Sequence, residues 1–252
     1  MQPTSKNEAE NAKCHVYCFC SAPAPEVSHI SGIEDSGVRA IEHKGVIAIA
    51  GDCSRPPEMS IHNVVAHNRV VSSILEATTP IPCRFGTTLS RRDLEIYIES
   101  RGEAVKALLR KFQGCVEMTL RIASIADAST GAPDGITHSP PDLSSPALRG
   151  PGTRFLEQKM RESSQQRLAS QHAQALLAWT DSQFGALVRD RVARPNPERS
   201  LVARVAHLLE RARLQRYQEL IAVAQCDRPD LRLSVSGPWA PYSFAVLGES
   251  IR

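Results

Sequence analysis

The first half of the chain alternates between two hydrophobic periods, one typical of helices and one typical of strands. Apolar residues recur at helical spacing after Ser60 and again after Ser90, and serine is a common N-cap in that position. Between Val116 and Ile122, apolar and polar residues alternate, which predicts a half-buried strand. Short apolar stretches bounded by turn residues predict further strands. The expected elements are strands at 15–20, 37–43, 45–51, 81–85 and 116–122 and helices at 60–78 and 90–112.

The second half has one long helical pattern and one ambiguous segment. Apolar positions predict a helix over about 153–191. Its middle, 162–174, is polar, so this part must project or be stabilised by its own side-chain pairs. Residues 201–226 fit a single helix, which the residue propensities favour, or a buried strand at 201–209 followed by a helix. A clean alternation then predicts a strand at 231–236.

Turn-forming residues separate the two halves. The segment 127–150 is rich in Pro, Gly, Ser and Asp, a composition typical of a linker rather than of a packed core. We therefore place a domain boundary there. The expected layout is a disordered tail at 1–12, an amino-terminal α+β domain at 13–126, a flexible linker at 127–150 and a carboxyl-terminal α+β domain with a long helix at 151–252.

The composition is that of an ordinary globular protein. Apolar residues make up 42% and charged residues 23% of the 252 positions, which is enough to bury a core. The longest uninterrupted apolar run, 46–50, is far shorter than the ~20 residues of a membrane span. The polar first residues lack the pattern of a signal peptide. We therefore expect a cytoplasmic protein without a membrane span.

Positive charge is concentrated in the second half. Residues 1–148 carry 14 basic and 17 acidic groups, whereas residues 149–252 carry 16 basic groups, nearly all arginines, and 10 acidic groups. Arginines suit polar protein surfaces as well as phosphates, and we favour a solvated helical face. The alternative hypothesis is an unrelated two-domain α+β regulatory or nucleic-acid-binding module that uses this arginine-rich half.

The residue types do not assemble into a recognisable catalytic or metal site. The seven cysteines include no Cys-x-x-Cys pair, and the sequence contains no phosphate-binding glycine motif. On a strand at 15–20, the cysteines would take one face and the histidine and aromatic residues the other. Cys83 is the best nucleophile candidate, because the neighbouring Arg84 could lower the pKa of its thiol. We nevertheless expect no enzyme activity, no cofactor and no metal.

Two further segments have residues that suit a fixed local structure. In the first, Pro82 fixes its own φ, Gly86 can adopt a positive φ, and Arg84 can form a two-pronged bond with a carboxylate such as Glu117. We favour a structural corner, with a core anchor at position 85, over a ligand site. In the second, at 236–244, prolines stiffen the chain beside a tryptophan and a tyrosine that suit a buried lid, which we favour, or an interface. The residues of this structural or interface motif are Pro82, Arg84, Phe85, Gly86, Thr87, Glu117, Gly237, Pro238, Trp239, Pro241, Tyr242 and Phe244.

Together these segments resemble the gas vesicle protein F/L family. The resemblance rests on His67-Asn-Arg-Val70, Pro82-Cys-Arg-Phe-Gly-Thr87, Gly114-Cys-Val-Glu117 and Ser236-Gly-Pro-Trp-Ala-Pro-Tyr-Ser-Phe244, where Ala240 stands in place of a family proline. It implies an α+β fold of two domains, with ferredoxin-like mixed sheets and a helical projection in the second domain. It also favours a strand over a helix at 201–209, because Val205-Ala-His-Leu-Leu209 matches a family strand.

The resemblance further implies a non-enzymatic accessory or minor structural protein of gas vesicles that supports vesicle nucleation or formation. The expected partners are the main gas vesicle shell protein (GvpA-like) and other accessory gas vesicle proteins, with no nucleic acid. A shell subunit exposes apolar surface before assembly, and an accessory protein can cover that surface.

Overall fold

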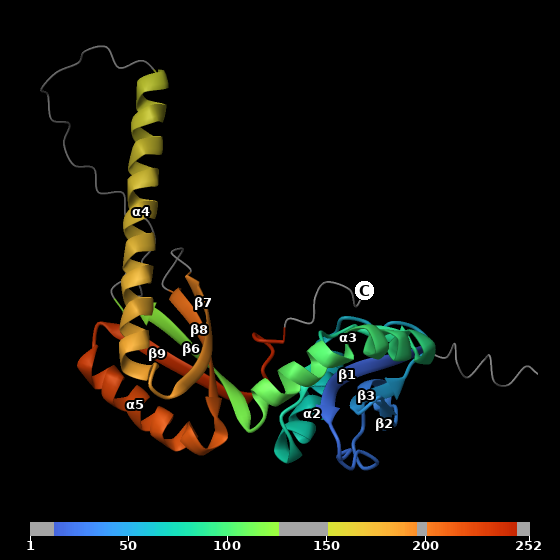
Figure 1. Cartoon of the computed structure of the whole chain (residues 1–252). Helices are drawn as coiled ribbons and strands as arrows, with labels where there is room; N and C mark the ends of the chain where they lie inside the picture. Colours follow the sequence, from blue (N-terminus) through green and yellow to red (C-terminus); the bar gives the residue numbers. More distant parts are fainter. Residues whose placement is uncertain (1–12, 126–150, 196–200, 246–252) are drawn as a thin grey trace, which may run out of the picture. The chain divides into compact units, whose positions relative to one another are not determined.

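The computed structural model describes residues 13–125, 151–195 and 201–245 (Figure 1). The chain forms two compact units. The first unit comprises residues 1–118, 208–212 and 237–252, and the second comprises residues 119–207 and 213–236. The tail expected at 1–12 and the linker expected at 127–150 lie outside the described residues.

An antiparallel sheet forms the centre of the first unit, in the strand order β2-β3-β1-β4, with β5 also paired with β1. We expected a mixed sheet, but all of these pairings are antiparallel. Strand β3 is buried on both faces and lies inside the sheet, as its continuous apolar sequence predicts. Lys44 and Gly45, both at positive φ, form the β2–β3 turn. The elements are β1 (Lys13–Ser21), η1 (Ile33–Asp35), β2 (Val38–His43), β3 (Val46–Asp52), β4 (Ile81–Pro82) and β5 (Thr88–Ser90).

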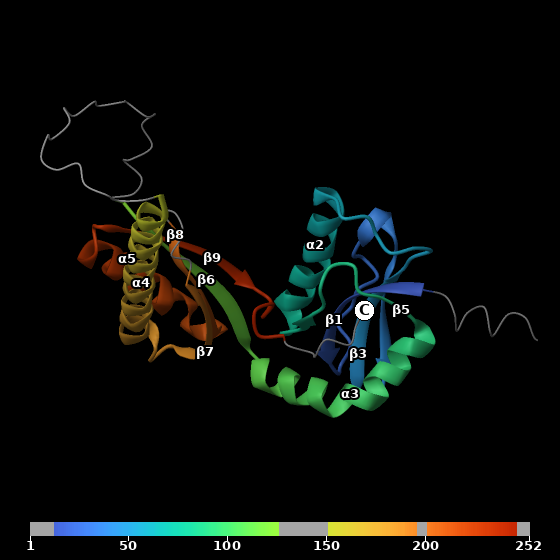
Figure 2. The same ribbon diagram turned by 90° about the horizontal axis from the view of Figure 1, so that it is seen from above.

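One helix covers each face of this sheet (Figure 2). Both helices, α2 (Ile61–Ala77) and α3 (Arg91–Phe112), begin at the predicted serine caps. The side chain of Ser60 accepts from the backbone N–H of Asn63, and Ser90 accepts in the same way from Asp93. The core on the α2 side joins apolar residues of α2 to those of β1, β2 and β3, and Phe19 stacks on Tyr97 of α3 on the other side.

A β-bulge in β1 redistributes its side chains between the two faces. The register against β3 shifts between Val16 and Cys18. Tyr17 therefore lies in the same core cluster as Cys18 and Cys20, on the α2 side, while Phe19 lies against α3. The simple alternation that we expected, with cysteines on one face and aromatic residues on the other, is wrong because the extra residue inverts the pattern after position 17.

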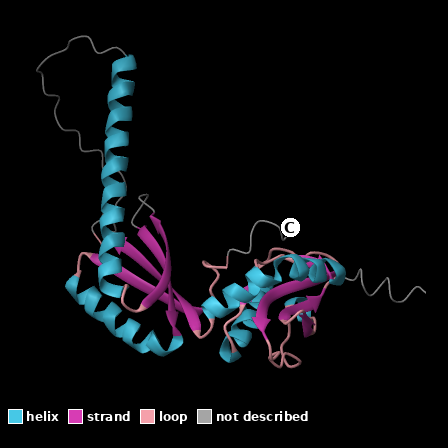
Figure 3. Ribbon diagram, viewed as in Figure 1, coloured by secondary structure: helices cyan, strands magenta, loops and turns pink. Residues whose placement is uncertain are grey.

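The second unit is built on a four-stranded sheet in the order β7-β8-β6-β9, drawn in magenta in Figure 3. Its elements follow one another as βαββαβ, the arrangement of a ferredoxin-like fold. They are β6 (Cys115–Ser124), α4 (Pro151–Phe184), β7 (Val188–Pro195), β8 (Leu201–Glu210), η3 (Arg211–Arg213), α5 (Leu214–Asp227) and β9 (Leu231–Trp239).

Both helices of the second unit pack on one face of its sheet. His207 of β8 lies against the rings of Phe184, at the end of α4, and Tyr217 of α5. The His207 Nδ1 and the Tyr217 hydroxyl are hydrogen-bonded at 2.8 Å. Burial lowers the pKa of His207 to about 4, so the ring is neutral at pH 7. Beyond this contact, α4 runs well past the sheet (Figure 1), as expected of a helix whose middle is polar.

Three expectations from the sequence change with the structure. The long helix ends at Phe184 rather than near residue 191, because the alternating residues that follow Gly185 form β7. The strand at 116–122 was placed in the amino-terminal domain, but β6 pairs within the second sheet. The closing residues from 237 onward belong to the first unit rather than to the carboxyl-terminal one. The strand interpretation of 201–209 is confirmed by β8.

Candidate functional site

The closing segment Gly237–Ala245, which we call the hook, is held by one buried carboxylate. Glu117 is only 4% exposed, and both of its oxygens accept hydrogen bonds from Ser243. The backbone N–H of Ser243 donates to Oε2, and its hydroxyl donates to Oε1, each at 2.7 Å. Burial raises the pKa of the Glu117 carboxyl, and these two hydrogen bonds oppose that shift.

The hook begins at a glycine that packs against β6. Gly237 has a φ of +129°, which a residue with a side chain rarely adopts. A Cβ atom at this position would lie 2.8 Å from the carbonyl oxygen of Glu117 and 2.7 Å from the sulfur of Met118. Two tight turns follow, in which the N–H groups of Tyr242 and Phe244 donate to carbonyls two and three residues earlier. The hook therefore has a fixed course.

The residues of the hook that are buried differ from those that we expected to be buried. We expected Trp239 and Tyr242 to form a buried lid, but they are 42% and 38% exposed. Ala240 and Phe244 take the buried positions, and Ala240 belongs to the core cluster on the α2 side. The small residue at position 240 fits that core, and the two large rings are partly exposed at the surface.

The outer face of α2 continues the surface that the hook begins. The Tyr242 hydroxyl donates to Oδ1 of Asn68 at 2.8 Å, which places its ring beside α2. Ile61 and Val65 lie two turns and one turn before Asn68 on the same helix face, and they are 86% and 51% exposed. We call Ile61, Val65 and Tyr242 the apolar stripe. Large apolar side chains this exposed are typical of an interaction surface when they cluster.

The carboxyl end of α2 is fixed by residues from distant parts of the sequence. The Arg211 guanidinium donates to the carbonyl of Leu75 in the last turn of α2, where a positive charge is favourable. The Thr79 hydroxyl donates to the carbonyl of Cys115 at 2.9 Å. These bonds position the helix that carries the apolar stripe.

The segment 82–87 forms a structural turn, which agrees with the interpretation that we favoured. The N–H and hydroxyl of Thr87 both donate to the carbonyl of Arg84, at 3.2 and 2.8 Å. Gly86 has a φ of +89°, as its residue type suggested. Phe85 is partly buried and packs against the core cluster. Pro82 ends the edge strand β4.

Two chemical roles that we considered for this segment are wrong. Arg84 is exposed and does not pair with Glu117, because Ser243 already occupies both oxygens of that carboxylate. Cys83 is buried, and burial raises the pKa of its thiol to about 12, so Arg84 does not activate it.

A buried histidine pair, which we did not predict, joins β1 to α2. His15 Nε2 and His67 Nδ1 are hydrogen-bonded at 2.9 Å, and both residues are about 2% exposed. Burial, with the neighbouring ring, lowers the pKa of His15 to about 3, and burial lowers that of His67 to about 4. The rings of Tyr17 and Phe85 pack around the pair. The available signal was the helical spacing from His67 to the apolar residues Val70, Val71 and Ile74, which we did not use.

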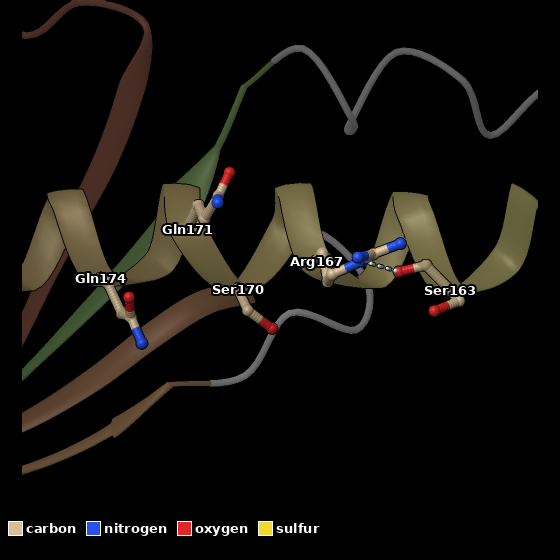
Figure 4. Close-up of a pocket in the computed structure, with 5 residues that line it drawn as sticks. All are labelled: Ser163, Arg167, Ser170, Gln171 and Gln174. Atoms are coloured by element: carbon tan, nitrogen blue, oxygen red, sulfur yellow. Dashed lines mark hydrogen bonds between the residues drawn. The ribbon is translucent and has the colours of Figure 1, made fainter. Parts of the chain in front are cut away.

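The surface hollows of the molecule include one that a single helix forms. One hollow, of about 360 Å³, is lined by five side chains of α4 alone, and Figure 4 shows that they project from a single helix. Its one drawn hydrogen bond runs from Nε of Arg167 to the carbonyl of Ser163 at 3.4 Å. Over the residues that the structure describes, no group of three or more His, Cys, Asp or Glu is arranged to hold a metal ion. Within the same residues, we find no helix with the length and apolar content needed to cross a bilayer.

Known proteins with similar sequences are gas vesicle proteins. The chain is 26% identical over 247 residues to gas vesicle protein L of Streptomyces sp. (strain CB03234), covering 89% of this chain and 88% of that protein. It is 26% identical over 259 residues to gas vesicle protein L1 of Halobacterium salinarum, with 92% and 89% covered.

The fold is similar to that of solved gas vesicle proteins. The crystal structure of GvpF from Anabaena sp. PCC7120 superposes with a TM-score of 0.72 at 16% identity, over 93% of this chain and 96% of the other. The family model described as gas vesicle synthesis protein GvpL/GvpF matches residues 13–246, nearly the whole chain. The alternative of an unrelated two-domain module is therefore wrong, and the chain belongs to the GvpL/GvpF family of gas vesicle synthesis proteins.

Proposed function

We propose that this protein is an assembly factor of gas vesicles that binds the main shell protein through the apolar stripe and acts without catalysis. The observation that carries the proposal is the exposure of Ile61 and Val65 beside Tyr242, on a helix and hook that are otherwise firmly held. Family membership supplies the context of the gas vesicle.

The stripe is suited to a partner with exposed apolar surface. Its residues come from one helix face and from a segment of fixed course, so binding requires little further ordering of the backbone. The Tyr242 ring adds apolar area with a polar tip, a residue type that is enriched at interfaces. A shell protein would lose exposed apolar area on binding here, before it enters the vesicle wall. In our proposal, this contact forms in the cytoplasm. Other accessory gas vesicle proteins are further candidate partners.

The direct test is binding of the purified full chain to the shell protein, compared with binding of substituted chains. Ile61→Gln combined with Val65→Gln removes two apolar side chains and replaces them with glutamine, which favours a helix. Burying such side chains contributes about 1.5 kcal/mol each, about 3 kcal/mol together, so the double variant should bind roughly a hundredfold more weakly. A strain that carries the double variant should form fewer vesicles.

Ile96→Gln is the matched control for Val65→Gln. Ile96 lies on α3 of the same unit and is 52% exposed, against 51% for Val65. The control should bind as the unsubstituted chain does. Equal losses in both variants, or full binding by the Ile61→Gln/Val65→Gln chain, would contradict a contact at the apolar stripe. Normal vesicles in a deletion strain would contradict the assembly role itself.

A further inference from the structure

Among the residues that the structure describes, the face of the second sheet opposite α4 and α5 carries arginines and no covering helix. Along β6, Leu120 and Ile122 are buried beneath the helices, while Arg121 between them is exposed. The same alternation exposes Arg204 on β8 and Arg232 on β9. Strands β8, β6 and β9 are neighbours in the sheet, so the three arginines lie on adjacent strands of one face. We call these three residues the arginine face.

Two backbone hydrogen bonds fix the register of these strands. The N–H of Arg211, just after β8, donates to the carbonyl of Gly114, just before β6, so the two strands run antiparallel. Counting along both strands from this bond places Arg121 directly opposite Arg204. The N–H of Ile125 donates to the carbonyl of Asp230, and the same counting places Arg232 diagonal to Arg121. Directly opposite side chains have Cβ atoms about 5 Å apart, and diagonal ones about 7–8 Å.

Like charges directly opposite each other destabilise a sheet. Other arginines of the second unit form ion pairs with carboxylates: Arg191 with Asp181, Arg216 with Glu219 and Arg228 with Asp230. In contrast, no carboxylate forms an ion pair with the arginine face among the residues that the structure describes. The only acidic residue on the strand segments of this unit is Asp190, on the edge strand β7. Within the described part of the unit, no ion pair compensates the repulsion.

We propose that the arginine face binds an acidic segment of a partner protein. A guanidinium bonds a carboxylate through two parallel N–H groups, and the carboxylates would relieve the repulsion between Arg121 and Arg204. Alternate residues of an extended segment lie about 7 Å apart on one side, close to the diagonal spacing of Arg121 and Arg232. This contact uses other residues than the apolar stripe and does not depend on the proposed shell-protein contact.

The chemistry of the face favours a polypeptide over a nucleic acid. Proteins that bind single-stranded nucleic acid on a sheet stack its bases on aromatic side chains. The neighbours of the arginine face are small residues instead: Thr119, Ala123, Ala206, Ser234 and Ser236. Carboxylates need no stacking surface, so arginines among small residues are sufficient for them.

The test is fluorescence anisotropy with the full chain and a labelled peptide of alternating glutamate and serine, at low salt. The variant Arg121→Gln/Arg204→Gln removes the opposed pair. The control Arg167→Gln/Arg216→Gln removes the same charge from exposed positions on α4 and α5. We expect the first variant to bind the peptide roughly tenfold more weakly, and the control to change by less than about twofold.

A second measurement separates lost recognition from lost folding. Because the opposed charges repel, Arg121→Gln/Arg204→Gln should raise the urea midpoint of the free protein while it weakens peptide binding. Absence of peptide binding by the unsubstituted chain, or equal losses in the two variants, would overturn the proposal. Tighter binding of a labelled single-stranded oligonucleotide of equal charge, with the same dependence on Arg121 and Arg204, would also overturn it and make the face a nucleic-acid surface.

Discussion

Removing the hydroxyl of Ser243 should measurably destabilise the first unit. Ser243→Ala deletes the donor to Oε1 of Glu117 and keeps the backbone N–H that donates to Oε2. Glu117 is buried, so water does not readily replace the lost donor. A hydrogen bond to a charged group contributes about 1.5–3 kcal/mol, and we therefore expect a loss of about 2 kcal/mol in the free energy of unfolding.

The chain contains a convenient reporter for this measurement. It has two tryptophans, and Trp239 lies in the hook itself. In a Trp179→Phe background, tryptophan fluorescence during urea unfolding reports on the hook alone. The midpoint of that transition should fall without a change in its slope, because the surface exposed on unfolding stays the same.

Two comparisons make the result interpretable. Ser72→Ala, at an exposed position of α2, should change the free energy of unfolding by less than about 0.5 kcal/mol. In a Glu117→Gln background, Ser243→Ala should cost only about 1 kcal/mol, because the hydrogen bond is then between neutral groups. A Ser243→Ala chain as stable as the Ser72→Ala chain, or an effect unchanged by Glu117→Gln, would refute the idea that the carboxylate holds the hook.

Three further outcomes follow from the burial of single residues. Burial lowers the pKa values of His15 and His67 to about 3 and 4, below the value of about 6.5 for a histidine in the unfolded chain, so their contribution to stability is complete above pH 6.5 and is lost as the pH falls. At pH 5, urea unfolding should show a loss of about 2 kcal/mol per histidine in the free energy of unfolding. An unchanged midpoint would contradict a neutral pair. Gly237→Ala should lower the free energy of unfolding by more than about 1 kcal/mol in the same assay, because of its positive φ and its close approach to β6. Iodoacetamide at neutral pH should modify the exposed Cys226 much faster than the buried Cys83, as peptide mapping of the alkylated chain would show.

Elements defined by neighbouring residues could be predicted from the sequence. The caps at Ser60 and Ser90 and the turn at Lys44 and Gly45 depend on backbone geometry within a few residues, and all are present. The strand β8 is instructive, because propensity alone favoured a helix there. Its residues form a strand because β8 pairs with β7 and β6 inside the sheet and its side chains toward the helices are buried, and tertiary packing outweighs an intrinsic preference of a few tenths of a kcal/mol per residue.

Features that depend on one inserted residue could not be read from the pattern. The bulge between Val16 and Cys18 exchanges the faces of β1, yet all residues from Cys14 to Cys20 are buried, so exposure does not distinguish the two registers. The position of the end of α4 was missed for a similar reason. Val188 fits the helical period as well as the strand period, and only its pairing in the sheet decides between them.

The hydrogen-bond partner of Glu117 could not be predicted, because it is distant in the sequence. Arg84 was the obvious choice because its charge is opposite and its motif is near in sequence, but the carboxylate is satisfied by Ser243, 126 residues away. The strands β6 and β9 explain this choice, because they are hydrogen-bonded neighbours and their ends bring Gly237 against Glu117. Two segments of the family resemblance, those that contain Glu117 and Ser243, are therefore joined by this contact. Arg84 takes no part in it and is exposed at the surface. A substitution at Glu117 or Ser243 should consequently impair vesicle formation through stability. The Ile61→Gln/Val65→Gln change should impair it through binding, and only this change should leave the urea midpoint unchanged.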